Sequence, residues 1–244
     1  MTRIDLSGGL VLVTGGAGSI GSTIALRAVQ AGVSVAVCDT NIDTAETIAA
    51  EINSKGAVSQ SFQLDVTDPA AVQDTMQRAV EELGPLCGLV TAHGLLRTAP
   101  LALQSHHDWQ RMMAVNVDGT FHAIQSSVPH LQSTGGAIVT LGSVSALIGS
   151  ADGGGYTTSK GAVLSLSYVA AGELAPKGIR VNNVAPGWLM VGSHTRPLKP
   201  AMIQMPSGGR PMRCIPLVAW PLQAMSLTQW CGSYPIRPHL SQVP

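Results

Sequence analysis

The chain has 244 residues with 14 basic and 14 acidic side chains, so its formal net charge is zero, and only 11% of its residues are charged. This length suffices for one well-buried α/β domain. No basic field exists to attract nucleic acid or anionic lipid, which excludes those partners and favours a small-molecule substrate.

The cysteines and the N-terminus point to a reducing, aqueous environment. Four widely spaced cysteines form no Cys-x-x-Cys pair, which argues against a disulfide framework or a metal site: Cys38, Cys87, Cys214 and Cys231. The N-terminus lacks a long apolar segment, and no run approaches the ~20 apolar residues of a membrane span. We therefore expect a cytoplasmic protein without membrane association.

Short apolar runs alternate with longer amphipathic stretches along the first three quarters of the chain. The runs predict strands at residues 10–14, 33–38, 61–64, 86–91, 137–141 and 179–184. Helical patterns fill the intervals. This alternation predicts a Rossmann-type α/β fold, a doubly wound parallel sheet with helices on both faces and a ligand crevice at the carboxyl ends of its strands.

A glycine-rich turn follows the first predicted strand. Gly15, Gly18 and Gly21 open the next helix, where backbone amides and the helix N-terminus can meet a pyrophosphate. A bare structural turn is the alternative. The candidate cofactor-binding residues in this segment are Thr14, Gly15, Gly18, Ser19, Ile20 and Gly21.

Asp39 ends the second predicted strand and can accept hydrogen bonds from a ribose diol. Its carboxylate would repel a 2′-phosphate, and no Arg or Lys lies between Arg27 and Lys55 to receive one, so NAD is favoured over NADP. The alternative is that Asp39 is the N-cap of the following helix.

Asp65 and Val66 end the third predicted strand, where a carboxylate can accept from an adenine amino group. The same segment is also a good helix-start signal. We expect Asp68 to be the N-cap of that helix, which leaves Asp65 free for the cofactor.

Tyr156 and Lys160 lie four residues apart, so on a helix they share one face, and Ser143 precedes Tyr156 by thirteen residues. A tyrosine titrates near pH ~10 when free, and a neighbouring ammonium favours its ionised form. This pair can therefore exchange a proton near neutral pH.

The ordered series resembles the short-chain dehydrogenase/reductase family over roughly residues 5 to 190. The residues that carry the resemblance are Thr14-Gly15 to Gly21, Asp39, Asp65-Val66, Asn116, Ser143, Tyr156, Lys160 and Asn182-Asn-Val-Ala-Pro-Gly187. The resemblance implies an NAD(P)-dependent oxidoreductase that acts on a secondary alcohol or its ketone.

The resemblance also implies a role for each catalytic residue. Tyr156 would be the acid or base, Ser143 would hydrogen-bond the substrate oxygen, and Lys160 would hold the nicotinamide ribose and lower the Tyr156 pKa. Asn116 would anchor a water relay, while Gly94, Pro186 and Gly187 would lie beside the cofactor. The alternatives are a strand-end cap for Ser143, a helix kink at Asn116 and packing for Tyr156.

Two segments depart from the family pattern. Thr91-Ala-His-Gly94 replaces the usual Asn-Asn-Ala-Gly and removes amide side chains that help to fix the sheet, and His93 is interpreted as a local substitution. Ser19 stands where a glycine is usual. The resulting glycine spacing also occurs in epimerases and dehydratases of the same superfamily, which is an alternative function.

The C-terminal part has a different character. Nine of the fifteen prolines follow residue 190, and no Asp or Glu follows Glu173. We therefore divide the chain into a catalytic domain at 1–190 and an aberrant Pro-rich tail at 191–244. The family's closing helix and strand are not recognisable here, so we expect the sheet to lack its last strand.

A shift of the reading frame would explain this tail. Permitted synonymous codons for Leu217 to Pro244, read from each third base, allow the product GRLATPGDVADAVVWLLSDSASFITGA, a family-like C-terminal segment. A divergent lid is the alternative for the tail. An inactive NAD-binding remnant or interaction protein is the alternative for the function. The resemblance also implies a homo-oligomer that forms through the helix that bears Tyr156.

Overall fold

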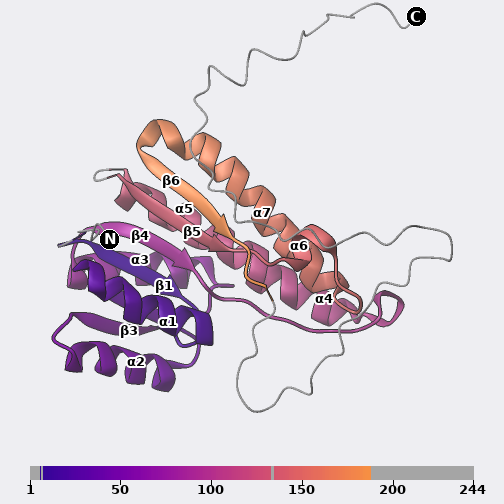
Figure 1. Ribbon diagram of the computed structural model, residues 1–244, viewed down its shortest axis with the longest axis horizontal. Helices are drawn as coiled ribbons and strands as arrows, with labels where there is room; N and C mark the ends of the chain where they lie inside the picture. Colours follow the sequence, from indigo (N-terminus) through magenta and orange to yellow (C-terminus); the bar gives the residue numbers. More distant parts are fainter. Residues whose placement is uncertain (1–5, 7, 133–134, 188–244) are drawn as a thin grey trace, which may run out of the picture. The chain divides into compact units, whose positions relative to one another are not determined.

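The computed structural model describes residues 6, 8–132 and 135–187. Their strands form one parallel sheet in the order β3-β2-β1-β4-β5-β6 (Figure 1). The strands are β1 (Leu10–Thr14), β2 (Ser34–Asp39), β3 (Ser59–Gln63), β4 (Leu86–Thr91), β5 (Gly136–Leu141) and β6 (Ile179–Val184). The predicted parallel Rossmann-type sheet is confirmed, and all six strands lie close to the predicted ranges.

Alternation along β1 explains the two hydrophobic layers. Leu10 and Leu12 pack into one core cluster, whereas Val11 and Val13 pack into the other. Successive side chains of a strand point to opposite faces, and every residue of β1 is buried. A central strand that is buried at each position therefore needs cover on both faces, as in a doubly wound fold.

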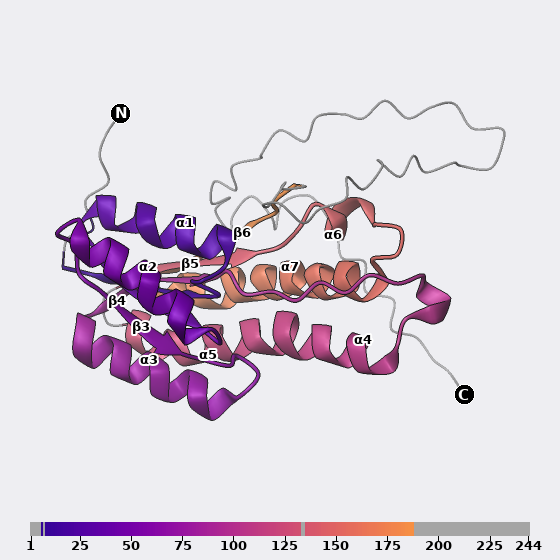
Figure 2. The same ribbon diagram turned by 90° about the horizontal axis from the view of Figure 1, so that it is seen from below.

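The helices divide between these two faces. Their bounds are α1 (Ser19–Ala28), α2 (Ile42–Ser54), α3 (Pro69–Leu83), α4 (His106–Met113), α5 (Gly119–Leu131), α6 (Ser145–Ile148) and α7 (Gly154–Leu174). Buried residues of α1 and α2 join the Val11 cluster, and those of α3, α5 and α7 join the Leu10 cluster. Figure 2 shows the sheet between these two groups of helices.

The half of the sheet that holds β5 and β6 is covered unequally. Ile138 of β5 is fully buried in the Leu10 cluster, whereas its neighbour Val139 is only partly buried on the other face. Val184, at the end of β6, is 49% exposed. Within the described ranges, only α1 and α2 contribute buried helix residues to the Val139 face.

Short helical segments connect the longer ones: η1 (Val29–Ala31), η2 (Leu101–Leu103), the π-helical η3 (Ala114–Asp118) and η4 (Ala175–Lys177). The sheet reverses its winding between β1 and its neighbour β4, and ligands of such folds bind at the carboxyl ends of these strands. The glycine-rich turn and the segment 92–95 both leave the sheet at this edge.

Several predictions from the sequence lie outside the described residues. These are the tail at 191–244, its proposed change of reading frame and the absence of a last strand, so the boundary near residue 190 stays a prediction. Among the residues that the structure describes, no helix is long and apolar enough to cross a membrane.

Candidate active site

The glycine-rich turn connects β1 to α1 with glycines where side chains would not fit. Gly15 has φ +67°, and a β-carbon there would collide with the backbone of His93. A β-carbon on Gly21 would collide with the carbonyl group of Gly15. Gly18 is the N-cap of α1, so the turn leads directly into a helix N-terminus that can receive an anion.

Asp39 connects the end of β2 to this turn. Its Oδ2 accepts a hydrogen bond of 3.1 Å from the backbone N–H of Ala17, and its Oδ1 accepts one of 3.0 Å from Asn41. The N-cap of α2 is Asn41, whose side chain accepts from Thr44 N at 3.1 Å. The alternative in which Asp39 caps this helix is therefore wrong, because Asn41 supplies the cap, while Oδ2 of Asp39 faces the glycine-rich segment.

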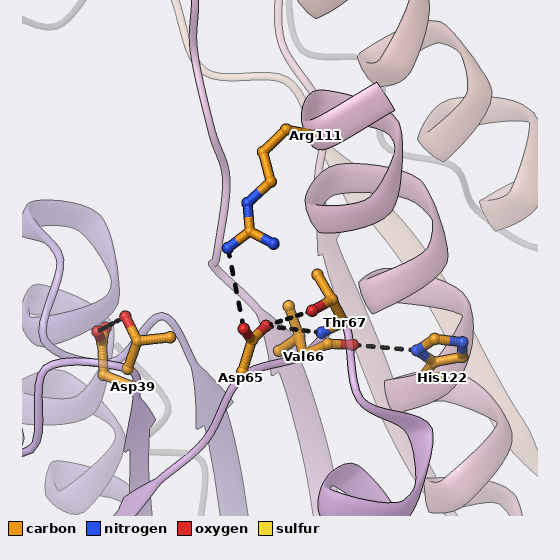
Figure 3. Close-up of polar contacts among 7 residues, drawn as sticks. Asp39, Asp65, Val66, Thr67, Arg111 and His122 are labelled. Carbon is orange, nitrogen blue, oxygen red and sulfur yellow. Dashed lines mark hydrogen bonds and ion pairs between the residues drawn. The ribbon is translucent and has the colours of Figure 1, made fainter. Parts of the chain in front are cut away.

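Asp65 lies in the loop after β3, two residues beyond the strand's last residue. Its Oδ1 accepts from the backbone N–H and the hydroxyl of Thr67, at 2.9 and 2.7 Å, and Oδ2 lies 3.9 Å from Arg111 Nη2 (Figure 3). The hydrogen bonds from Thr67 are the main cause that lowers the pKa of Asp65, and Arg111 lowers it further. The prediction that Asp65 does not cap the following helix is confirmed, and its side chain remains about half exposed although Oδ1 accepts from Thr67.

The N-cap predicted for α3 is confirmed, since Asp68 Oδ1 accepts from Ala70 N and Ala71 N at 2.9 and 3.2 Å. The carbonyl oxygen of the intervening Val66 lies 3.0 Å from His122 Nδ1 on α5 (Figure 3). A carbonyl can only accept, so this contact places a proton on Nδ1. The loop that holds Asp65 and Val66 is thus fixed from α4 and from α5.

A cavity of about 440 Å³ lies beside the carboxyl ends of β4 and β5 and the segment that follows β6. It gathers residues from five separate segments of the sequence. The candidate site residues among its lining are Ile20, Gly94, Ser143, Tyr156, Lys160, Pro186 and Gly187, and further lining residues include His93, Ser145 and Asp152. The predicted catalytic tyrosine, lysine and serine therefore face one shared space.

Lys160 is buried, with its side chain between α7 and the end of β5. Its Nζ donates to Leu141 O at 2.7 Å and lies 5.9 Å from the centre of the Tyr156 ring. Burial lowers the pKa of this ammonium to about 8. Gly94 lies beside this ammonium, since a β-carbon at that position would contact Nζ at 3.4 Å.

Asn116 lies in the π-helical segment η3 and is 1% exposed. Its Oδ1 accepts from Leu95 N at 2.7 Å, and its Nδ2 donates to Leu95 O at 3.0 Å and to Ser159 Oγ at 2.8 Å. Single π-helical turns inside helices often mark functional positions. The alternative, in which Asn116 holds an irregularity of the helix, is compatible with this geometry. The irregular turn directs the Asn116 amide toward the backbone of Leu95.

Ser143 follows β5 by two residues, in a loop held by the end of β6. Gly142 N donates to Val184 O at 2.8 Å, and Val144 N donates to Pro186 O at 3.0 Å. The Ser143 hydroxyl accepts from Ser145 N at 3.2 Å and lies 2.7 Å from Ser145 Oγ. One of these two serines donates its hydroxyl hydrogen to the other, whose own hydroxyl hydrogen is then left to point into the cavity.

Three polar residues of this region were not predicted as site residues from the sequence. Ser159 bridges Asn116 to Tyr156 O, to which its hydroxyl donates at 2.7 Å. Ser145 contacts Ser143, and Arg111 contacts Asp65. The sequence offered only proximity for Ser145 and Ser159, which adjoin predicted residues, and no signal for Arg111.

The family of this chain follows from comparison with known proteins. The family described as short chain dehydrogenase matches residues 9–199, which include every described strand. The chain belongs to this family, as the ordered motifs predicted. Its members act as oxidoreductases with nicotinamide cofactors, and the described site has the concave form and glycine-rich turn that such a cofactor requires.

The regions that match known proteins cover most of the described residues. The "Inactive 2-(S)-hydroxypropyl-CoM dehydrogenase 2" of Xanthobacter autotrophicus is 42% identical, over 67% of this chain and 70% of its own. A NAD⁺-bound xylitol dehydrogenase has a TM-score of 0.73 at 33% identity, covering 77% and 72% of the two chains. A gluconate 5-dehydrogenase from Burkholderia cenocepacia, in complex with NADP and tartrate, has a TM-score of 0.73 at 30% identity, covering 76% and 73%.

Proposed function

We propose that this chain transfers hydride between NAD and a secondary alcohol or its ketone, with Tyr156 as the acid or base. The observation that carries the proposal is the shared cavity that Ser143, Tyr156 and Lys160 line at the carboxyl edge of the sheet. The glycine-rich turn opens at the same edge, so a dinucleotide and a small substrate can meet there.

In this mechanism the hydroxyl of Ser143 donates a hydrogen bond to the substrate oxygen and stabilises charge that develops on it. Tyr156 removes the hydroxyl proton when an alcohol is oxidised, and returns a proton to the oxygen when a ketone is reduced. A bound nicotinamide supplies the acceptor or the donor of the hydride. The Lys160 Nζ lies 5.9 Å from the centre of the Tyr156 ring, so its ammonium can hold the nicotinamide ribose beside the acid or base.

The preference for NAD rests on Asp39. Its carboxylate is held beside the glycine-rich turn by Ala17 N, at the place where an adenosine ribose would lie. Relatives of this fold are known with either cofactor, so the Asp39 carboxylate is what favours NAD in this chain. A 2′-phosphate near it would meet an uncompensated negative charge.

The experiment combines binding and turnover. NADH and NADPH are titrated by fluorescence, and a panel of secondary alcohols and ketones is assayed with the wild type and Tyr156→Phe. The matched control is Tyr168→Phe, which removes the same hydroxyl from an exposed residue of the same helix. Turnover that Tyr156→Phe abolishes and Tyr168→Phe retains supports the proposal, whereas equal turnover of both variants contradicts it.

A cofactor-binding protein without turnover is the second candidate. The relative of 42% identity supports this second candidate, because its name describes it as an inactive dehydrogenase. The same panel separates the two candidates. NADH binding without any Tyr156-dependent turnover would select the inactive protein.

A homo-oligomer through the helix that bears Tyr156 belongs to the same proposal. Tyr168 and Val169 of α7 are 58% and 55% exposed, and Phe121 of α5 is 46% exposed. Large apolar side chains on neighbouring helices support a subunit contact there. Light scattering of the wild type and of a Tyr168→Lys/Val169→Lys variant tests this, and a wild-type monomer would contradict it.

A further inference from the structure

His93 bridges two parts of the site that are far apart in the sequence. It follows β4, it is 8% exposed, and its Nδ1 lies 2.7 Å from the hydroxyl of Thr14 at the end of β1. Its Nε2 lies 3.3 Å from the hydroxyl of Thr120 on α5. Both threonines are buried, so neither hydroxyl is open to water.

The neighbouring hydrogen bonds determine which nitrogen carries the proton. The Thr120 hydroxyl donates its only hydrogen to Asn116 O at 2.7 Å, so toward His93 it can only accept. The backbone of Val115 forms a further hydrogen bond with the imidazole. Nε2 therefore carries the proton, and Nδ1 accepts from the hydroxyl of Thr14, which lies 2.7 Å from Nδ1 and 3.4 Å from its other acceptor, Val90 O.

The surroundings keep this ring neutral. Burial, and after it the charge of the Lys160 ammonium, lower the pKa of His93 to about 3, although the hydrogen bond with the Val115 backbone acts in the opposite direction. Two glycines next to His93 also leave no room for side chains. A β-carbon on Gly119 would come within 3.2 Å of Nε2, and a β-carbon on Gly15 would collide with the His93 backbone.

We propose that His93 is a positioning residue, a neutral bridge that holds the glycine-rich turn and the π-helical segment with Asn116 in a fixed relation. Thr14 directly precedes the turn, and Thr120 binds the carbonyl of Asn116 itself. The family pattern has two amide side chains where this chain has Thr91 and Ala92. His93 thereby supplies a polar connection that Thr91 and Ala92 do not form. The proposal rests on the proposed function, since it assigns the bridge to that reaction.

The catalytic consequence follows from geometry. Asn116 binds Leu95 and Ser159, and Ser159 binds the carbonyl of Tyr156, so a shift of η3 is transmitted to the acid or base. Misplacement by about 1 Å can cost about a hundredfold in rate. Loss of the bridge should therefore lower kcat more than it raises the KM of the alcohol.

Three variants test the bridge. His93→Leu keeps the apolar volume without hydrogen bonds, His93→Gln offers one donor and one acceptor, and Thr120→Val removes one partner without a change of shape. We expect a kcat reduced about tenfold to a hundredfold in His93→Leu, partial recovery in His93→Gln and a reduction in Thr120→Val. The double variant His93→Leu/Thr120→Val should lose less than the sum of the two single losses, because the contact between His93 and Thr120 is absent in both, while only Thr120→Val also removes the hydrogen bond to Asn116 O.

The control variant is Ser127→Ala on α5. Ser127 is fully buried and donates to Ile124 O at 2.8 Å, so its loss disturbs the same helix away from the site. We expect it to lower stability with kcat retained. If His93→Leu retains wild-type kcat, or if the effects of His93→Leu and Thr120→Val simply add, the bridge is overturned.

A readout that needs no turnover completes the test. Nitrogen-15 NMR of the cofactor-free protein should show a neutral His93 ring with its proton on Nε2 between pH 5 and pH 8, changed by Thr14→Val. A proton on Nδ1, or a charged ring near neutral pH, would overturn the bridge even in an active enzyme. Absence of Tyr156-dependent turnover in the wild type would instead overturn the proposed function, so the two failures are distinguishable.

Discussion

The amide nitrogen of Asn116 donates a hydrogen bond of 2.8 Å to the hydroxyl of Ser159, and this contact joins the π-helical segment η3 to the helix that carries Tyr156. Ser159 completes the connection by donating to the carbonyl oxygen of Tyr156. Two residues separated by 43 positions in the sequence thus fix the backbone of the candidate acid or base.

Replacement of Ser159 by Ala should destabilise the fold and slow turnover. It leaves the buried amide of Asn116 without one acceptor, a loss that typically costs about 1–3 kcal/mol. Urea unfolding measures the free energy of unfolding, and steady-state assays measure kcat. The matched control is Thr158→Ala, an exposed neighbour, and equal stability of the two variants would contradict the expectation.

Replacement of Asp39 by Ala should weaken NADH binding by about tenfold, the effect of about 1.4 kcal/mol in lost hydrogen bonding. It should also reduce the discrimination against NADPH, because the repulsive carboxylate is gone. Fluorescence titration with both cofactors measures this. Asp43→Ala, in the first turn of α2, removes a nearby charge as the control. Unchanged NADH affinity in Asp39→Ala would disprove the ribose contact.

His93 should make the stability of the fold sensitive to acid. Its pKa is about 3 in the folded protein against 6.5 in the unfolded chain, so the unfolded state binds the extra proton between these values. The stability contribution is therefore complete above pH ~6.5 and is lost as the pH falls toward about 3.

The measurement is Tm of the wild type and of His93→Gln between pH 7 and pH 4. The variant should lose less stability than the wild type over this interval, since it has no imidazole to protonate. His107→Gln removes an exposed histidine as the control, and it should follow the wild type. Parallel losses in all three proteins would contradict a low pKa of His93.

Asp152 should tolerate glycine better than a branched residue. It has φ +58°, in the left-handed region, and it is exposed at the rim of the cavity. Glycine adopts this conformation without strain, whereas a branched side chain does so at a cost of about 1–3 kcal/mol. Thermal unfolding should give Asp152→Gly a Tm at or above the wild type and Asp152→Val a lower one. The reverse order would refute the strain argument.

The coding DNA should contain the family-like C-terminal segment in its alternative frame. The permitted codons for Leu217 to Pro244 allow that segment throughout, including at the Met and Trp codons, which have no synonyms. Sequencing the DNA between the codons for about Met190 and Leu217 should locate the change of frame. A chain with the frame restored should unfold at a higher temperature than this one. An alternative frame that encodes no such segment would disprove the hypothesis.

Local pattern was enough to predict the strands and the glycine-rich turn, because both depend on neighbouring residues. Buried runs such as Leu10–Thr14 are continuous in the sequence, and the turn is recognisable from three glycines before a helix. The direction of the Asp39 carboxylate could not be predicted in the same way. Asp39 and Asn41 are both good cap residues, and only the packed turn shows which one the helix uses.

His93 illustrates the remaining limit. By sequence it is a substitution at a position where the family has a small residue, and its partners Thr14 and Thr120 are 79 and 27 positions away. The sequence by itself determined the parallel fold, the family and the order of the candidate catalytic residues, since periodicity and motif spacing are local properties. Only the tertiary structure decided which polar groups meet in the buried site, because burial and hydrogen bonding depend on which strand ends and helices the fold brings together.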